Sequence, residues 1–514
     1  MNINDITQRF TTLFPGDKTF NTHQRNTPNV LYALVNPAHF ENIELVGYNQ
    51  ELSNRIGLGK FKEEDLAFLG AQNLPEFLTP YATAYAGHQF GNWAGQLGDG
   101  RAIFAGEITN PNGESFELQW KGAGATPYSR FADGRAVLRS SVREYLMSEA
   151  MFHLGVPTTR ALSLVKTGEN VTRDPLYNGK IKDEPGAIVL RVAPSFLRYG
   201  HFELLSAQKN VDLLRQLADF TIENYFPDIT STGTEKYKEW FTAISQQTVK
   251  LIVEWYRVGF IHGVMNTDNM SIIGQTIDYG PYSMLEDYDL NFTSNTTDLP
   301  SKRYTFGNQG KIAQWNLWQL ANALFPLIQD EAYLEETLNN FSLDFWLEHD
   351  AMLCRKFGID QQPDDEGKFF TDWQDMMTAL QLDHTLFFIQ LEKWRLNPQL
   401  SLFEEASYKN LSSDDLEKIE KFLQDYENLV SKNFLKTSDS IKIMAENNPK
   451  FILRNYMLQE CIEALEKGDD SLFKTFEDLI KQPYHITTSH QQWIKKRPSK
   501  YDNLPGCTML SCSS

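Results

Sequence analysis

Cysteine is scarce in this sequence. Its 514 residues include four, which are Cys354, Cys461, Cys507 and Cys512. They are too few and too scattered for the disulfide framework that stabilises small secreted domains. None of them belongs to a Cys-x-x-Cys pair, the spacing typical of structural zinc sites. A disulfide scaffold and a structural zinc site are therefore not expected.

Long apolar runs are also missing. No stretch approaches the roughly 18 uninterrupted apolar residues that a membrane-spanning helix needs. Residues 1–16, MNINDITQRFTTLFPG, have neither the apolar core of a signal peptide nor the Arg-rich, acid-poor pattern of a transit peptide. We expect a cytoplasmic protein without a membrane partner.

Positive charge is in deficit. Lys and Arg number 48 against 67 Asp and Glu, which gives a formal net charge of −19. Because a nucleic-acid backbone is bound by clustered Lys and Arg, this balance argues against nucleic acid as the main partner. A local basic site for a small phosphate ligand is still compatible with it. The 41% hydrophobic and 22% charged residues are typical of a soluble globular protein.

The pattern along the chain divides it into three stretches. Residues 1–80 are a mixed leader, expected to pack on the next stretch. In residues 81–205, glycine-rich turns separate short β-like runs, whereas residues 206–514 are mainly helical. Strands followed by helices predict an α+β fold.

Several elements can be placed within these stretches. Residues 102–108 and 115–120 flank an Asn-Pro-Asn-Gly turn, which predicts a hairpin. Apolar residues at helical spacing predict a helix over 137–154, and residues 187–192 (AIVLRV) predict a buried strand. A long amphipathic helix is expected to end at Gly259.

The most informative segment, residues 261–282, follows that helix. Kinase-like phosphotransferases carry a His-x-Asp base motif, a metal-binding Asn a few residues later, and an Asp-Phe-Gly-like Asp for metal. Here Asn269 lies seven residues after His262, and Asp278 opens Asp-Tyr-Gly. Oxygen atoms of an Asn and an Asp suit Mg²⁺, which binds few protein ligands together with phosphate oxygens.

One position departs from the kinase pattern. Val264 stands where the usual catalytic Asp is expected, and valine cannot accept a proton. Asp268 supplies a carboxylate nearby that could activate a hydroxyl if the nucleotide lay in another orientation. The alternative is that Asp268 and Asn269 form only an Asx-rich turn.

A nucleotide cradle is predicted upstream. Gly98, Gly100 and Arg101 precede a β-like run, and two glycines there let backbone N–H groups approach phosphates; a plain hairpin turn is the alternative. Lys121 ends a strand, as the phosphate-binding Lys of kinases does, and Glu144 on the next helix is its candidate partner. Both could instead be exposed.

Two arginines complete the set. Arg191 and Arg198 lie in the apolar segment VLRVAPSFLR, and planar guanidinium groups match phosphate oxygens. Each could instead be a solvated surface residue.

Taken together, four segments resemble the selenoprotein O (YdiU) family of protein adenylyltransferases. They are LGDGRA at 97–102, KGAGATPYSRFADGRAVLRSSVREYL at 121–146, RVAPSFLRYGHFE at 191–203 and HGVMNTDNMSIIGQTIDYGPY at 262–282. The resemblance extends from about residue 20 to the C-terminus. It implies a protein-kinase-like bilobal fold with a strand-rich N-lobe, a helical C-lobe and helical extensions. It also implies that ATP binds flipped relative to kinases, with its α-phosphate towards the acceptor.

The resemblance assigns roles to the candidate residues. Asp268 becomes the catalytic base, and Asn269 and Asp278 become ligands of Mg²⁺ or Mn²⁺. Lys121 would contact the phosphates and be held by Glu144. The remaining members of the nucleotide cradle would be Gly98, Gly100, Arg101, Asp133, Gly134, Arg191 and Arg198.

The implied activity is transfer of AMP from ATP to Ser, Thr or Tyr hydroxyls of proteins, including the enzyme itself, with release of pyrophosphate. The choice between ATP and UTP stays open. Cys512 lies where some members carry selenocysteine, with an inert thiol as the alternative. The rival hypothesis, favoured by Val264, is a nucleotide-binding pseudokinase scaffold without transfer activity. A small-molecule phosphotransferase would need another base, for which we find no candidate.

Overall fold

The computed structural model describes residues 1–511 except 176–178, 364–366 and 503. Cys512 lies outside the described residues. Cys354, Cys461 and Cys507 are buried, and none of these three forms a disulfide bond.

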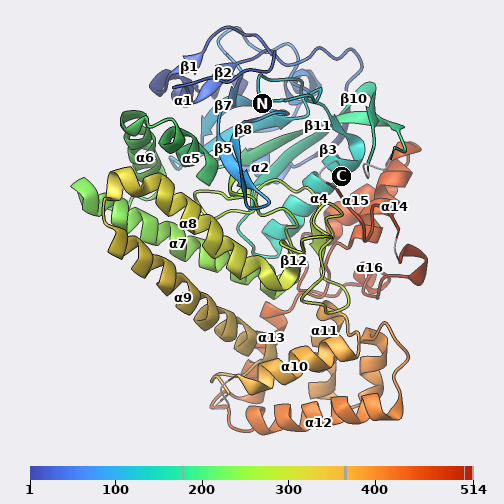
Figure 1. Cartoon of the computed structure of the whole chain (residues 1–514). Coiled ribbons are helices and arrows are strands. Elements are labelled where there is room, and N and C mark those ends of the chain that lie inside the picture. Colours follow the sequence, from blue (N-terminus) through green and yellow to red (C-terminus); the bar gives the residue numbers. More distant parts are fainter. Residues whose placement is uncertain (176–178, 364–366, 503, 512–514) are drawn as a thin grey trace.

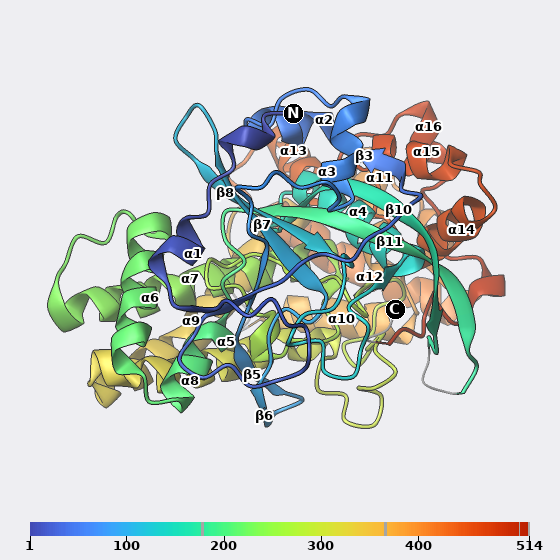
Figure 2. The ribbon, with the colours of Figure 1, turned by 90° about the horizontal axis from the view of Figure 1, so that it is seen from above.

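A nine-stranded sheet forms the N-terminal half of the molecule (Figures 1 and 2). Its strand order is β1-β2-β4-β7-β8-β11-β10-β3, with β9 paired to β11. Neighbours are antiparallel except for β1 and β2. The strands are β1 (Gly16–Asp17), β2 (Tyr32–Leu34), β3 (Glu44–Tyr48), β4 (Tyr81–Thr83), β7 (Ala102–Thr109), β8 (Ser115–Lys121), β9 (Ala136–Val137), β10 (Arg160–Arg173) and β11 (Lys182–Ala193).

Both faces of this sheet are covered, which explains the nearly continuous apolar strands. Successive side chains of a strand point to opposite faces. In β11, Val189 therefore joins a core cluster shared with the helices, whereas Ile188 and Leu190 join a second cluster. That second cluster contains Trp120 of β8.

Two short sheets lie apart from the large one. β5 (Ala86–Gln89) and β6 (Asn92–Gln96) form a hairpin, and β12 (Phe260–Ile261) pairs with β13 (Ser283–Met284).

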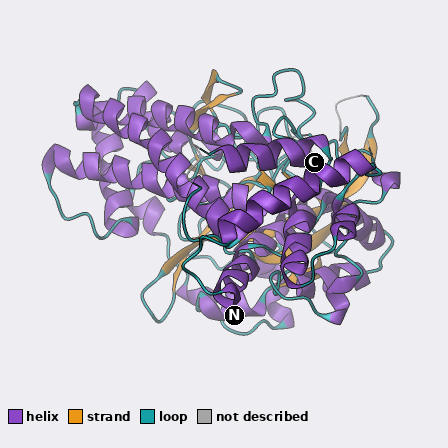
Figure 3. Ribbon diagram, turned by 90° about the horizontal axis from the view of Figure 1, so that it is seen from below, coloured by secondary structure: helices purple, strands orange, loops and turns teal. Residues whose placement is uncertain are grey.

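Helices make up most of the remainder, and they dominate the molecule seen from below (Figure 3). They are α1 (Arg9–Leu13), α2 (Gln50–Arg55), α3 (Leu66–Leu69), α4 (Leu138–His153), α5 (Tyr199–Ala207), α6 (Val211–Tyr225), α7 (Gly233–Val258), α8 (Gln309–Ile328), α9 (Glu331–Phe357), α10 (Lys368–Ala379), α11 (His384–Leu396), α12 (Ser413–Val430), α13 (Thr437–Asn447), α14 (Asn455–Glu466), α15 (Ser471–Leu479) and α16 (Thr488–Gln491).

From α7 onward, the helices gather in distinct groups in Figure 1. α7, α8 and α9 pack side by side, and α10 to α13 gather at one end of the molecule. α14 and α15 return to the sheet, where Phe473 stacks on Tyr145 of α4 with 5.5 Å between ring centroids. None of the helices in the described part of the chain combines the length and apolar character needed to span a bilayer.

The α+β prediction is confirmed: a strand-rich half precedes a helical half. The predicted hairpin is β7–β8, the helix over 137–154 is α4, and the strand over 187–192 lies within β11. α7 ends at Gly259, whose φ of 75° places it in the left-handed conformation that suits glycine. Residues 1–80 contribute β1, β2 and β3 to the large sheet. The domain boundaries at 80 and 205 stay predictions.

Candidate functional site

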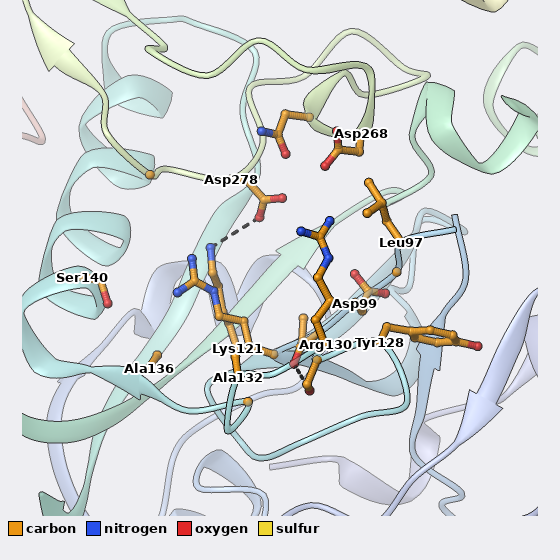
Figure 4. Close-up of a pocket in the computed structure, with 18 of the residues that line it drawn as sticks. Leu97, Asp99, Lys121, Tyr128, Arg130, Ala132, Ala136, Ser140, Asp268 and Asp278 are labelled. Atoms are coloured by element: carbon orange, nitrogen blue, oxygen red, sulfur yellow. Dashed lines mark hydrogen bonds and ion pairs between the residues drawn. The ribbon is translucent and has the colours of Figure 1, made fainter. Parts of the chain in front are cut away.

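A pocket of about 760 Å³ lies between the large sheet and the loop that follows β12. Figure 4 shows Asp268 and Asp278 on one side of this pocket and Lys121 pointing towards Asp278 from the sheet. The predicted site residues that line it are Gly98, Gly100, Arg101, Lys121, Asp133, Gly134, Arg191, Arg198, Asp268, Asn269 and Asp278. Glu144, the remaining predicted residue, is not among the lining residues but contacts Lys121.

Lys121 and Glu144 form a buried ion pair. Lys121 is the last residue of β8, and its Nζ atom lies 2.8 Å from Oε2 of Glu144 on α4. The other carboxylate oxygen of Glu144 accepts a hydrogen bond from Nη1 of Arg191, at 3.0 Å. All three side chains are buried, so the alternative of an exposed Lys and Glu is wrong. A strand Lys paired with a helix Glu is the arrangement found in kinase folds.

Asp278 is surrounded by cations. Nη1 of Arg191 donates to Oδ1 at 2.6 Å, Nη1 of Arg198 donates to Oδ2, and Nζ of Lys121 lies 3.4 Å from Oδ1. Burial alone would raise the pKa of Asp278, but Arg198, Lys121 and Arg191 hold that pKa well below its ordinary range. Arg191 and Arg198 are themselves buried, so the alternative of solvated surface arginines is wrong.

Asp268 presents a different environment. It lies in a 3₁₀ helix, Thr267–Asn269, where its Oδ2 accepts a hydrogen bond from Nε2 of Gln89 at 3.0 Å. Its Oδ1 is buried and has no hydrogen-bond partner among the described residues. Burial raises the pKa of this carboxyl to about 6, and the Gln89 bond opposes the rise. A carboxylate with one free oxygen in a pocket can accept a proton there.

The residues around Asn269 fit a divalent metal. Nδ2 of Asn269 donates to the backbone oxygen of Val264 at 2.8 Å, so Oδ1 is the remaining polar atom of this side chain. Asp278 supplies an ionised carboxylate to the same pocket. The described residues contain no cluster of three or more His, Cys, Asp or Glu suited to a metal. A site of two oxygen ligands completed by phosphate matches the preference of Mg²⁺.

The glycines of the cradle are required by close packing. Gly98 has a φ of 150°, and a Cβ there would lie 2.4 Å from Cγ of Tyr128. Gly134 has a φ of 70°, and its Cβ would lie 2.2 Å from the backbone oxygen of Gly124. Residues 97–101 connect β6 to β7, which belong to different sheets, so the alternative of a simple hairpin turn is wrong.

Asp133 lies at the rim of the pocket. It forms a two-point ion pair with Arg173, with distances of 2.8 and 2.7 Å, and its side chain is 46% exposed. Partial burial acts to raise the pKa of Asp133, but the hydrogen bonds from Arg173 outweigh it and lower this pKa.

Some lining residues escaped the sequence reasoning. Asp99 is buried, accepts a hydrogen bond from the Thr83 amide at 3.0 Å, and lies 3.8 Å from Nη2 of Arg198. Its position between Gly98 and Gly100 was a usable signal. No sequence signal marked Gln89 or Arg173, because a lone glutamine and a lone arginine are common on surfaces.

Comparison with known proteins agrees with this geometry. The model of the family described as protein adenylyltransferase SelO matches residues 17–483. A protein of Cytophaga hutchinsonii named protein nucleotidyltransferase YdiU is 46% identical over 99% of this chain and 98% of its own length. A protein of the same name from Flavobacterium johnsoniae is 45% identical over 99% of both chains.

A solved structure of ROP2 from Toxoplasma gondii, titled a virulence factor with a protein-kinase fold and no enzymatic activity, is 11% identical and covers 58% of this chain and 97% of its own. Its TM-score is 0.24, a weak overlap. The family match and the full-length relatives are decisive: this chain is an enzyme of the protein adenylyltransferase SelO family, a nucleotidyltransferase that acts on proteins.

Proposed function

We propose that this enzyme transfers AMP from ATP to Ser, Thr or Tyr hydroxyls of proteins, itself included. The hydroxyl oxygen attacks the α-phosphorus, the bond from that phosphorus to the β-phosphate oxygen breaks, pyrophosphate leaves, and the hydroxyl proton passes to Asp268. The observation that carries this proposal is the unpartnered, buried Oδ1 of Asp268 in a pocket where Val264 occupies the usual base position.

The cations of the pocket support a polyphosphate ligand. Lys121, Arg191 and Arg198 converge on Asp278, and all of them line the pocket. Guanidinium groups that hold the β- and γ-phosphates would also stabilise the negative charge that develops on departing pyrophosphate. Arg101, Asp133 and the Gly98, Gly100 and Gly134 loops would complete the cradle.

Asn269 and Asp278 are the residues that would hold Mg²⁺ or Mn²⁺. When bound, the ion would neutralise phosphate oxygens and polarise the phosphorus under attack.

Labelled nucleotides test the proposal. The protein is incubated with α-³²P-ATP and γ-³²P-ATP in parallel, with α-³²P-UTP as a third arm that decides the donor. We expect protein-bound label from the α-position only. Label from the γ-position alone would show phosphoryl transfer and defeat the proposal. ATP binding with no covalent product under any metal would instead favour the pseudokinase scaffold, which Val264 makes the second candidate.

A further inference from the structure

The β5–β6 hairpin leaves the large sheet and docks on the helical half of the molecule. Figure 2 shows it projecting from the sheet near α5. Its contacts are with α5 and with the 3₁₀ helix that carries Asp268. Residues from the strand-rich half thus reach the loop to which we assign proton transfer.

Two backbone amides of the hairpin, on alternate residues, bind this loop. The His88 N–H donates to Oγ1 of Thr267 at 2.7 Å. The Phe90 N–H lies 3.1 Å from Oδ1 of Asn266 and 3.0 Å from the Tyr304 hydroxyl. Because the donors are backbone groups, side-chain substitutions in the hairpin leave them in place.

The turn fixes the register of the hairpin. Gln89 pairs with Asn92, so the loop is the two residues Phe90 and Gly91, with φ values of 51° and 84°. Two positive φ values are typical of a type I′ turn. Positive φ is costly for phenylalanine, and such strain persists only where surrounding contacts hold it.

The approach of hairpin to loop depends on small residues. A Cβ on Gly87 would lie 3.0 Å from both Cβ and Oδ1 of Asp268. A Cβ on Gly200, in α5, would lie 2.1 Å from the backbone oxygen of Ala86. Larger side chains at these positions would push the hairpin away.

This close approach brings the side-chain amide of Gln89 to the carboxylate of Asp268. Nε2 of Gln89 donates to Oδ2, and Oε1 of Gln89 accepts from Nη2 of Arg130 at 3.4 Å. Arg130 therefore favours the amide orientation that presents the NH₂ group to Asp268. On the other side, Nη1 of Arg198 holds the backbone oxygen of Asp268 at 2.7 Å. The carboxylate is fixed through Oδ2, while the buried Oδ1 has no hydrogen-bond partner among the described residues.

We infer that Gln89 is a positioning residue, carried by the β5–β6 hairpin, that orients the Asp268 carboxylate for proton transfer from the acceptor hydroxyl. The inference rests on the proposed role of Asp268. The hairpin thus serves the transfer of the hydroxyl proton, because Gln89 contacts the carboxylate that accepts it. The cations proposed to bind phosphate lie elsewhere, on β8, on β11 and in the segment before α5.

Substitutions of Gln89 test the inference in the full-length enzyme. Gln89→Met keeps the length but removes the donor, and Gln89→Glu keeps the shape but places a second carboxylate beside Asp268. Losing a hydrogen bond to a charged group predicts that kcat for AMP transfer falls about 10- to 100-fold in Gln89→Met. We expect a larger fall in Gln89→Glu, with the Kd for ATP of Gln89→Met at the wild-type value. A purely packing role would reverse that order, since Glu matches Gln in shape.

Further variants separate the possible outcomes. Gly87→Ala should lower kcat with Gln89 intact, whereas Asn92→Ala, opposite Gln89 in the hairpin and exposed, should keep wild-type kcat. Gln89→Met added to Asp268→Asn should cause no further loss, because groups that act as a unit are not additive. Wild-type kcat in Gln89→Met, with Asp268→Asn inactive, would overturn the positioning role alone. Wild-type kcat in Asp268→Asn would overturn the proposed function itself.

Discussion

Nη1 of Arg191 lies 2.6 Å from Oδ1 of Asp278, so the carboxylate proposed to bind metal is already paired with a cation that is proposed to bind phosphate. Arg198 and Lys121 add to this pairing. A metal ion and these side chains therefore compete for the same oxygens, and a polyphosphate would relieve the competition by attracting the cations.

We predict that nucleotide and metal bind cooperatively. Mn²⁺ should bind the free enzyme weakly, and a non-hydrolysable ATP analogue should raise its affinity by about 5- to 150-fold, the usual range of coupling between two sites. Titrations followed by electron paramagnetic resonance measure both affinities. Equal Mn²⁺ affinity with and without the analogue would contradict the prediction, and Asp278→Asn should remove the coupling.

Glu144→Gln should destabilise the fold and weaken ATP binding. The substitution leaves Lys121 and Arg191 buried without the carboxylate that lies 2.8 and 3.0 Å from them. Breaking a buried ion pair from one side costs about 3–5 kcal/mol in the free energy of unfolding. Urea denaturation measures the change. Glu44→Gln is the matched control, because Glu44 is 68% exposed and 3.8 Å from Lys166, and we expect less than about 1 kcal/mol there.

Gly98→Ala should impair nucleotide binding. The new Cβ would collide with Tyr128 in the cradle and would add strain at a φ of 150°. We expect a higher Kd for ATP, measured by calorimetry. Gly113→Ala, in the β7–β8 turn, also places a side chain at a positive φ, of 85°, but its Cβ would meet no described atom within 4 Å. Wild-type ATP affinity is expected for that control, and equal losses in both variants would point to backbone strain alone.

His201 predicts a pH dependence of stability. Burial and the neighbouring Arg198 lower the pKa of this histidine to about 3, and its Nδ1 accepts a hydrogen bond from the Arg198 amide at 3.0 Å. In the unfolded chain its pKa is about 6.5, so between these values the unfolded state binds more protons. Its contribution is therefore complete above pH 6.5 and is lost as the pH falls towards 3.

The measurement is the free energy of unfolding of wild type and His201→Gln from pH 7.5 to 5. Below pH 6.5 the wild type should lose stability relative to the variant, approaching about 1.4 kcal/mol per pH unit. The difference isolates His201 from buried carboxyls such as Glu117, whose pKa is raised and whose contribution has the opposite sign. Parallel curves for the two proteins would refute the prediction.

Local pattern was enough to predict part of this site. Lys121 follows a β-like run and Glu144 lies on a regular apolar helix, so a strand–helix ion pair could be anticipated. The spacing of Asn269 and Asp278 likewise predicted two oxygen ligands in one loop, and the structure places both in one pocket. Their roles in binding and catalysis stay predictions.

Other features depend on contacts between distant segments. Gln89 and Asp268 are separated by 179 positions, and their hydrogen bond exists only because Gly87 lets two backbones approach. The second half of β10 is polar (KTGENVTR), so no apolar pattern marks that part of the strand. Local periodicity likewise does not predict that β3 pairs with β10.

The placement of β1, β2 and β3 has a consequence for biosynthesis. They form the two margins of the large sheet, with β1 and β2 on one side and β3 on the other. A strand such as β3 must therefore wait for a partner that is synthesised later, since Tyr48 pairs with Ser163. Long-range pairing of this kind slows folding. A version starting at residue 81 would expose β4 and β10 as open edges, which promote aggregation.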